Sequence, residues 1–237
     1  MDEYFRAVAK CSSTTELWHI YTSFLFERGY HALMAMHMPG VPLRTAKHPL
    51  MILTGYPEGW RHRYIEEGLF AFDPVVLHVV RSKQALRWSE LFSRYTLTPR
   101  QSEFLRVHLI GQVGDGVAVP TFGPDGRNGL ATFASNDRIT PPDAGEIAIL
   151  QSMAQAAHQR VCELIPIPSQ YLVPLSPREL EILQWVARGK SNSVIAEIVA
   201  ISTHTVDTYL RRIYEKLGVT DRVSAAVTGV VQGLVSP

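Results

Sequence analysis

Cysteine is scarce in this chain: Cys11 and Cys162 are the only two among 237 residues, and no CxxC pair occurs. Their separation argues against a disulfide framework or a cysteine-based zinc site, and it favours a reducing cytoplasm. Long apolar runs are lacking too, since none approaches the ~18 residues that a membrane-spanning helix needs. The N-terminal segment MDEYFRAVAK begins with acids and lacks the basic-then-apolar order of a signal peptide. These absences predict a cytoplasmic protein with no membrane partner.

Net charge is almost absent as well. The whole chain carries +1, and the segment from residue 174 onward has seven Lys and Arg residues against six Asp and Glu residues. Bulk attraction to nucleic acid is thereby excluded, and any DNA binding must rest on a few well-placed basic side chains, doubled by dimerisation. With 46% hydrophobic residues, the chain has ample material for a core, and its length suits two domains.

The clearest boundary along the chain is a proline-rich stretch. Pro166, Pro168 and Pro174 cannot continue a helix, and they favour an extended, semi-rigid connector. We therefore expect a first domain over residues 1–165, a linker over 166–174 and a second domain over 175–237.

The first domain mixes helical and strand patterns. Helices are predicted over about 14–28, 58–67, 74–81, 99–110 and 142–164. Strands are predicted over about 31–38, 51–54, 116–120 and 129–134. The turn-rich segment 122–128 joins the last two strands as a hairpin. These elements predict an α+β domain, an α/β/α sandwich around an antiparallel sheet.

The second domain is purely helical. Four helices are predicted, over about 177–188, 192–199, 203–217 and 221–232. The capping box Ser176–Glu179 starts the first, and Ser191 and Ser202 can cap the second and third. In the second helix we expect these residues to face inward: Val194, Ile195 and Ile198. The third has a one-sided apolar stripe made by Val206, Leu210, Ile213 and Leu217. A short helix, a tight turn and a longer helix with such a stripe form the helix-turn-helix arrangement.

The third helix offers candidate DNA contacts on its remaining faces. Its first two turns can reach base edges, whereas Arg211 and Arg212 are better placed for phosphates. The start of the second helix can add backbone contacts. The candidates are Lys190, Ser191, Asn192, Thr203, His204, Thr205, Asp207, Thr208, Arg211 and Arg212. The helix pattern alone fits equally well an all-helical packing domain with a solvated charged face.

The order of residues in this domain favours DNA binding. Residues 175–234 closely resemble the DNA-binding domain of LuxR-type regulators. The matching residues are Glu179, Leu183, Gly189, Ile195, Ala196, Thr205, Val206, Lys216, Leu217, Gly218 and Arg222. The resemblance implies a third helix in the major groove and a fourth in dimer contact. Asp207 departs from the family, where a lysine is common. Because an acid repels phosphate but can accept from cytosine, we expect it to alter site preference.

In the first domain, aromatic residues accompany one carboxylate. Trp60 and Tyr64 are four residues apart and project from one face of a helix. Rings supply apolar area, Trp and Tyr donate to carbonyls, and Asp73 can accept from an N–H, which suits a small amphipathic ligand. Plainer roles are also open: Trp60 and Tyr64 as core, Asp73 as the cap of a helix that starts at Pro74, and Trp88 as a seal at the sheet edge.

The spacing of these residues resembles the autoinducer-binding domain of LuxR-type quorum-sensing regulators, over about residues 15–165. Residues 55–76, Trp88 and residues 116–133 carry the resemblance. It implies that Trp60 holds the lactone carbonyl and Asp73 the amide N–H of an acyl-homoserine lactone.

The same resemblance assigns the other ligand contacts. It implies that Tyr56 and Thr132 bind the acyl carbonyl, and that Tyr64 and Trp88 pack around the ring. For the acyl tail we expect contacts with Met34, Met36, Val75 and Leu130. These residues leave the tail preference open.

Together the two resemblances predict a ligand-responsive transcription regulator. It would bind an acyl-homoserine lactone, need no cofactor, and bind a palindromic promoter site as a homodimer, for which helix 142–164 is a candidate contact. RNA polymerase would be a further partner.

Other functions fit the sequence less well or stay open. A phosphorylated receiver domain is disfavoured, because Asp2–Glu3 follows no strand and the βα alternation is missing. A lactone-hydrolysing enzyme is disfavoured, because the nine histidines form no HxHxDH or HExxH cluster. A regulator that answers a different small molecule, or none, stays open, as does an interaction protein that does not bind DNA.

Overall fold

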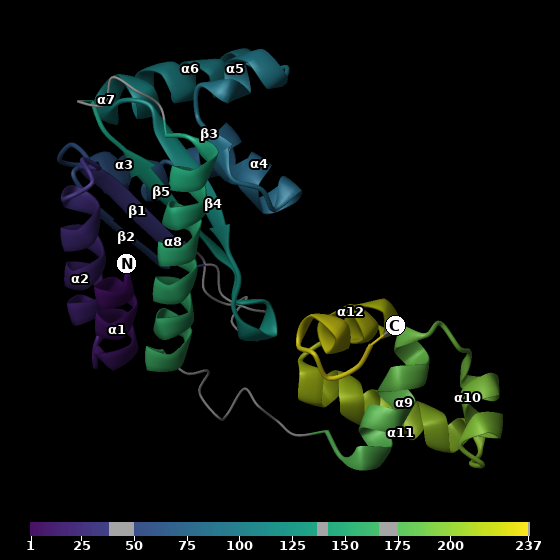
Figure 1. Ribbon diagram of the computed structural model, residues 1–237. Helices are drawn as coiled ribbons and strands as arrows, with labels where there is room; N and C mark the ends of the chain where they lie inside the picture. Colours follow the sequence, from purple (N-terminus) through teal and green to yellow (C-terminus); the bar gives the residue numbers. More distant parts are fainter. Residues whose placement is uncertain (38–49, 137–141, 166–174, 237) are drawn as a thin grey trace. The chain divides into compact units, whose positions relative to one another are not determined.

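The computed structural model describes residues 1–37, 50–136, 142–165 and 175–236 (Figure 1). These residues form two compact units, one within residues 1–165 and the other over residues 175–236. The expected linker 166–174 lies outside the described residues. Among the described helices, none combines the length and the apolarity that crossing a membrane requires.

The first unit is built on a five-stranded antiparallel sheet with the order β2-β1-β5-β4-β3. The strands are β1 (Ala32–His37), β2 (Leu50–Thr54), β3 (Leu86–Arg87), β4 (Gly116–Thr121) and β5 (Gly129–Ala134). The four predicted strands are present, with ends within two residues of those expected. The fifth, β3, was missed because a two-residue strand leaves no pattern in the sequence.

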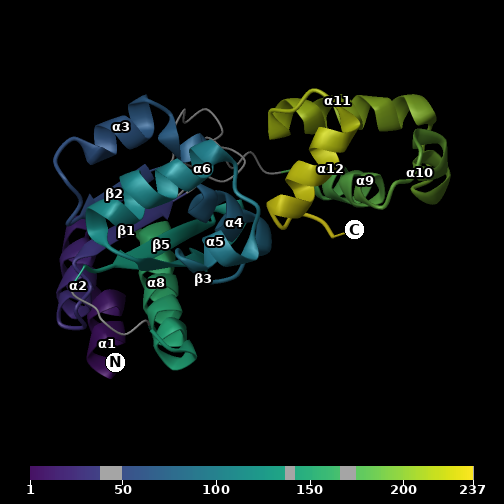
Figure 2. The same cartoon turned by 90° about the horizontal axis from the view of Figure 1, so that it is seen from above.

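One face of this sheet is covered by α1 (Asp2–Lys10), α2 (Thr14–Phe26) and α8 (Ala144–Leu164), as Figures 1 and 2 show. Alternate strand residues such as Leu33, Val117 and Phe133 pack against them. The helix α8 starts after Asp143, whose side chain accepts a hydrogen bond from the amide of Glu146.

The apolar stripe of α8 is buried inside this unit, with Leu150 and Met153 fully covered. This stripe is therefore used for packing on the sheet and is not free for a dimer contact.

The other face carries the shorter helices. These are α3 (Trp60–Glu66), α4 (Pro74–Ser82), α5 (Glu90–Arg94), α6 (Pro99–Glu103) and α7 (Gly111–Val113), with a 3-10 turn at Leu69–Ala71 and a π-helical segment at Phe104–Ile110. A further 3-10 turn, Pro124–Gly126, lies between β4 and β5. The helix predicted over 99–110 is thus divided between α6 and the π-helical segment. With helices on both faces of an antiparallel sheet, the predicted α+β sandwich is confirmed (Figure 2).

The second unit contains α9 (Pro177–Ala187), α10 (Asn192–Ile198), α11 (Thr203–Leu217) and α12 (Arg222–Val231). Ser176, Ser191 and Ser202 each accept a hydrogen bond from an amide of the helix that follows, as the sequence predicted. The tight turn between α10 and α11 places Ala200 in the left-handed region, at φ 53°. Four helices, two of them joined by such a turn, confirm the helix-turn-helix prediction.

One expectation for α10 was wrong. Val194 and Ile198 are exposed, whereas Ile195 is buried as expected, and Ala196 and Val199 are buried with it. The stripe of α11 fixes which side of α10 is covered, and a seven-residue helix is too short for its own pattern to reveal that side.

Candidate functional site

The Asp73 carboxylate lies in the first unit at the start of α4, where it is 2% exposed. Its Oδ1 accepts the amides of Val75 and Val76 at 2.8 and 3.3 Å, and its Oδ2 accepts the Tyr64 hydroxyl at 2.8 Å. Burial raises the pKa of this carboxyl to about 6, and the hydrogen bonds from Tyr64 and the two amides oppose the rise. Asp73 therefore caps α4 and is also the candidate group for binding a ligand.

Three aromatic rings lie in a row beside Asp73: that of Tyr56, just after β2, and those of Trp60 and Tyr64 in α3. The Trp60 ring lies 4.5 Å from the Tyr56 ring and 4.6 Å from the Tyr64 ring, measured between centroids, and it stacks on Tyr64 with an interplanar angle of 16°. The indole N–H of Trp60 donates to the backbone carbonyl of His108 at 2.8 Å. A ligand carbonyl would have to replace that acceptor.

Tyr56 also reaches the sheet. Its hydroxyl lies 3.2 Å from the Thr132 hydroxyl on β5. The preceding Gly55 has φ 80°, and a Cβ there would lie 1.8 Å from the carbonyl oxygen of His31. Only glycine fits this turn, which sets where Tyr56 emerges from β2.

Trp88 follows β3 and is fully buried, with no partner for its indole nitrogen among the described residues. A Cβ on Gly116 would come 2.9 Å from the Trp88 ring, so glycine at 116 makes room for this indole. A buried N–H without a partner is a costly feature, and a polar ligand atom would remove that cost.

The residues expected along the acyl tail share one cluster with these rings. Met34, Met36, Val75 and Leu130 are all at most 3% exposed and pack with Trp60, Tyr64 and Trp88. The structure thus brings together the whole predicted ligand set. The sequence offered no sign of two further members, the His108 carbonyl and the Phe104 ring, whose centroid lies 6.1 Å from that of Tyr64.

In the second unit, α11 displays part of the predicted DNA-contact set. Thr203, His204, Arg211 and Arg212 are exposed, as are Lys190 and Ser191 near the start of α10. Thr205 and Thr208 are half-buried. Their hydroxyls make local bonds, to the Ser202 hydroxyl at 2.8 Å and to the His204 carbonyl at 3.0 Å.

We expected Asp207 to face outward from the third helix, but its side chain is not free. It is half-buried, and its Oδ1 accepts the Asn192 amide at 2.6 Å. Arg222 donates to the Asn192 side-chain oxygen at 2.7 Å and also to the carbonyl of Lys190. Asp207, Asn192 and Arg222 therefore tie the starts of α10 and α12 to α11.

A second polar link lies inside the second unit. Glu179 is 3% exposed, and its Oε2 accepts from the Lys216 ammonium at 2.8 Å and from the Ser176 amide at 2.6 Å. Burial alone would raise the pKa of Glu179, but these hydrogen bonds outweigh it and hold the pKa below its ordinary value. The link joins the start of α9 to the end of α11.

Known families match both units. Residues 13–161 match the autoinducer-binding domain, and residues 173–228 match the bacterial regulatory proteins of the luxR family. The chain belongs to the LuxR family. The y4qH protein of Sinorhizobium fredii, an HTH-type transcriptional regulator by name, is 32% identical over 184 residues, which are 77% of this chain and 56% of that protein. The transcriptional activator protein AnoR of Acinetobacter nosocomialis is 30% identical over 197 residues, 81% of this chain and 82% of that one.

Solved structures share the fold. The crystal structure of Escherichia coli SdiA superposes with a TM-score of 0.70 at 23% identity, over 97% of this chain and 95% of that chain. The protein is therefore a LuxR-type, autoinducer-binding transcription regulator, and its relatives are regulators rather than enzymes. The family and the non-enzymatic role predicted from the sequence are both confirmed.

Proposed function

We propose that this regulator binds an acyl-homoserine lactone at Asp73 and then binds a palindromic promoter site as a homodimer. The observation that carries the proposal is the buried Asp73 carboxylate beside the Trp60 ring and the Tyr56–Thr132 hydroxyl pair. An amide N–H of the ligand suits the carboxylate, an acyl carbonyl suits the two hydroxyls, and a lactone carbonyl suits the Trp60 N–H.

Binding would exchange internal hydrogen bonds for bonds to the ligand. Tyr64 donates to one oxygen of Asp73, and the Trp60 N–H donates to the His108 carbonyl. A ligand that enters this core and does not bind the unfolded chain stabilises the first unit by mass action, by about 2.7 kcal/mol at a hundred times its Kd.

The dimer proposal is supported by an apolar stripe on α12. Val223 and Val227 are 71% and 53% exposed, and Val230, three residues further on, is also exposed. Their spacing of four and three places them on one face of the helix. Joining two copies through this face would double the Arg211–Arg212 pair and give the near-neutral module enough local positive charge for DNA. A target in chromosomal DNA places this activity in the cytoplasm.

Thermal unfolding of the full chain with a panel of acyl-homoserine lactones tests the ligand proposal. The panel should include short, long and aryl acyl groups, with the free acyl acids and homoserine lactone as controls. We expect at least one lactone to raise the Tm by several degrees. A panel in which no lactone raises the Tm, with DNA binding also unchanged, would favour a regulator of a different small molecule or of none.

A further inference from the structure

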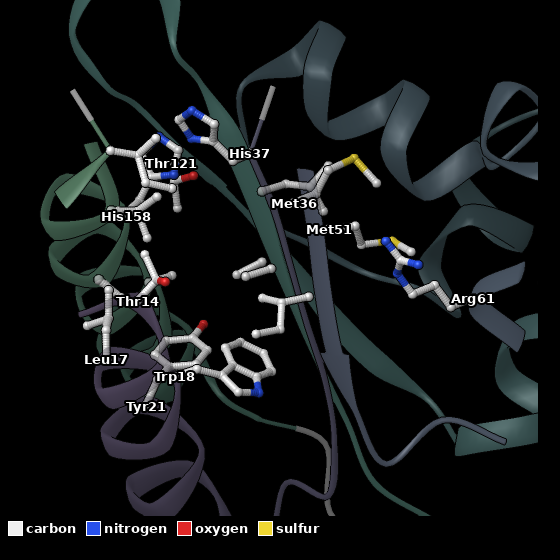
Figure 3. Close-up of a pocket in the computed structure, with 18 residues that line it drawn as sticks. Thr14, Leu17, Trp18, Tyr21, Met36, His37, Met51, Arg61, Thr121 and His158 are labelled. Atoms are coloured by element: carbon white, nitrogen blue, oxygen red, sulfur yellow. The ribbon is translucent and has the colours of Figure 1, made fainter. Parts of the chain in front are cut away.

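A cavity lies on the opposite face of the sheet from Asp73, between α2 and α8 (Figure 3). Its volume is about 310 Å³, at the lower end of the range for small-molecule sites. Apolar side chains form most of its walls, among them Leu17, Trp18, Ala35, Ala154, Ala157 and Val161. None of the six polar and aromatic residues of the Asp73 site lines it. Two of the residues expected along the acyl tail, Met36 and Leu130, do border it, and Figure 3 shows the Met36 side chain pointing away from His37 and His158.

Unpartnered polar atoms are concentrated in this cavity. Five buried side-chain nitrogen or oxygen atoms lack a hydrogen-bond partner among the described residues. Three of the five belong to residues that line the cavity: the Tyr21 hydroxyl, Nδ1 of His37 and the Thr121 hydroxyl. All three side chains are at most 8% exposed. A buried polar atom without a partner is energetically costly, so the His37 and Thr121 atoms, which lie together at one end of the cavity, indicate a ligand that satisfies them (Figure 3).

The polar end of the cavity favours an acceptor. His37, Thr121 and His158 lie together there, as Figure 3 shows, and none of the described lining residues is Asp or Glu. The buried Arg127 lies close enough to both imidazoles to disfavour their protonation, and Arg61 contributes the one charged side chain among the described lining residues. Burial, followed by the charges of His158 and Arg127, lowers the pKa of His37 to about 4, so the imidazole is neutral at pH 7. Hydroxyl and imidazole N–H donors beside a buried guanidinium suit a carboxylate.

We propose that this cavity binds a small carboxylic acid with an apolar tail, as a second effector site separate from Asp73. The carboxylate accepts from His37 and Thr121, and the tail lies along Leu17, Trp18 and Ala157. The contrast with Asp73 follows from charge. A buried carboxylate selects an N–H donor on one face of the sheet, whereas the other face offers donors near a buried Arg.

A metal ion is the competing occupant. Each of His37, His158 and Cys162 offers a ligand atom, and these atoms lie within 4.8 Å of one another. The buried Arg127 disfavours a divalent cation there, because its guanidinium donates to the Cys162 and Ile165 carbonyls and cannot lose its charge. A cavity of about 310 Å³ is also far larger than an ion.

Calorimetric titration of the full chain with decanoate, below its micellar concentration, tests the proposal. We expect binding at one site, and binding of 1-decanol at least tenfold weaker, because decanol keeps the tail and lacks the carboxylate. Ala35→Leu fills the cavity from β1 and should abolish decanoate binding. Thr121→Val keeps the side-chain shape, removes the hydroxyl and should weaken decanoate about tenfold.

Thr132→Val is the matched control, since it removes a hydroxyl from the opposite face of the sheet; decanoate binding should stay within twofold of the wild type. Loss of decanoate binding in Thr132→Val but not in Ala35→Leu would place decanoate in the Asp73 site and overturn the proposal. No decanoate heat in a folded wild type would overturn it too. Zinc binding that Cys162→Ser abolishes, with no effect of decanoate, would assign the cluster to a metal instead.

Discussion

The two units of this regulator differ in the exposure of their functional polar groups. In the first unit Asp73 and Thr132 are almost fully buried and are satisfied by other protein atoms. In the second unit Arg211 and Arg212 stand exposed on α11. A ligand must therefore compete with internal hydrogen bonds in one unit, whereas DNA adds new contacts in the other. The first arrangement favours selectivity among small molecules, and the second favours affinity that depends on salt and on copy number.

The largest expected effect comes from removing the exposed charge. Arg211→Ala combined with Arg212→Ala should weaken DNA binding by on the order of a hundredfold, because a dimer loses about four phosphate contacts. The slope of log K against log salt should become shallower by about 3.6. Fluorescence anisotropy over a salt series measures both quantities. The exposed Arg188 lies outside α11, and Arg188→Ala is the matched control; equal losses in both variants would contradict the assignment of α11.

The pH dependence of the two units should have opposite signs. Asp73 has a folded pKa of about 6, above the ~3.9 of an unfolded Asp, so its stabilising contribution is complete below that lower value and is lost as pH rises through about 6. The shift corresponds to roughly 3 kcal/mol. Glu179 has a lowered pKa, so its contribution is present above the unfolded value and is lost as pH falls through the folded value.

Hydrogen exchange followed separately in the two units between pH 4 and 7 measures this contrast. In the absence of ligand, the first unit should become more protected from exchange as pH falls from 7 to 5, after correction for the intrinsic exchange rate. Asp73→Asn should flatten that profile and leave the second unit unchanged. A profile of the first unit that Asp73→Asn does not alter would refute the role of this carboxyl.

A smaller effect is expected from the exposed stripe of α12. Val227→Glu introduces a charge at a 53% exposed position, so the fold of the second unit should persist while the proposed dimer weakens. We expect DNA affinity to fall about tenfold and the sedimentation of the DNA-free protein to shift toward the monomer. Ser224→Glu, at the position after Val223 and off the stripe, serves as the comparison; it also removes the hydrogen bond that Ser224 donates to Asp221. A stable dimer of the Val227→Glu variant would show that the interface does not lie on α12.

The sequence predicted features that depend on neighbours along the chain. The caps at Ser176 and Asp73 each depend on residues two or three positions away, and the strands β4 and β5 each begin at a glycine. Features that depend on register or on distant segments were not predictable. The His108 carbonyl at Trp60, the Arg222–Asn192–Asp207 link and the cavity between α2 and α8 all join residues that are far apart in the sequence. The roles of the ligand-binding residues were predicted from the family resemblance, because their spacing alone did not distinguish ligand contacts from core and capping roles.

The most direct test couples the two units in one titration. Fluorescence anisotropy would follow the full chain binding to DNA selected by the protein itself, with and without the lactone that raises the Tm most, for the wild type, Asp73→Asn and the exposed-carboxylate control Glu66→Gln. We expect the lactone to tighten DNA binding at least tenfold in the wild type and the control, and Asp73→Asn to need about 10–100 times more lactone for the same effect. An unchanged lactone response in Asp73→Asn, or DNA binding that no lactone alters, would contradict this expectation.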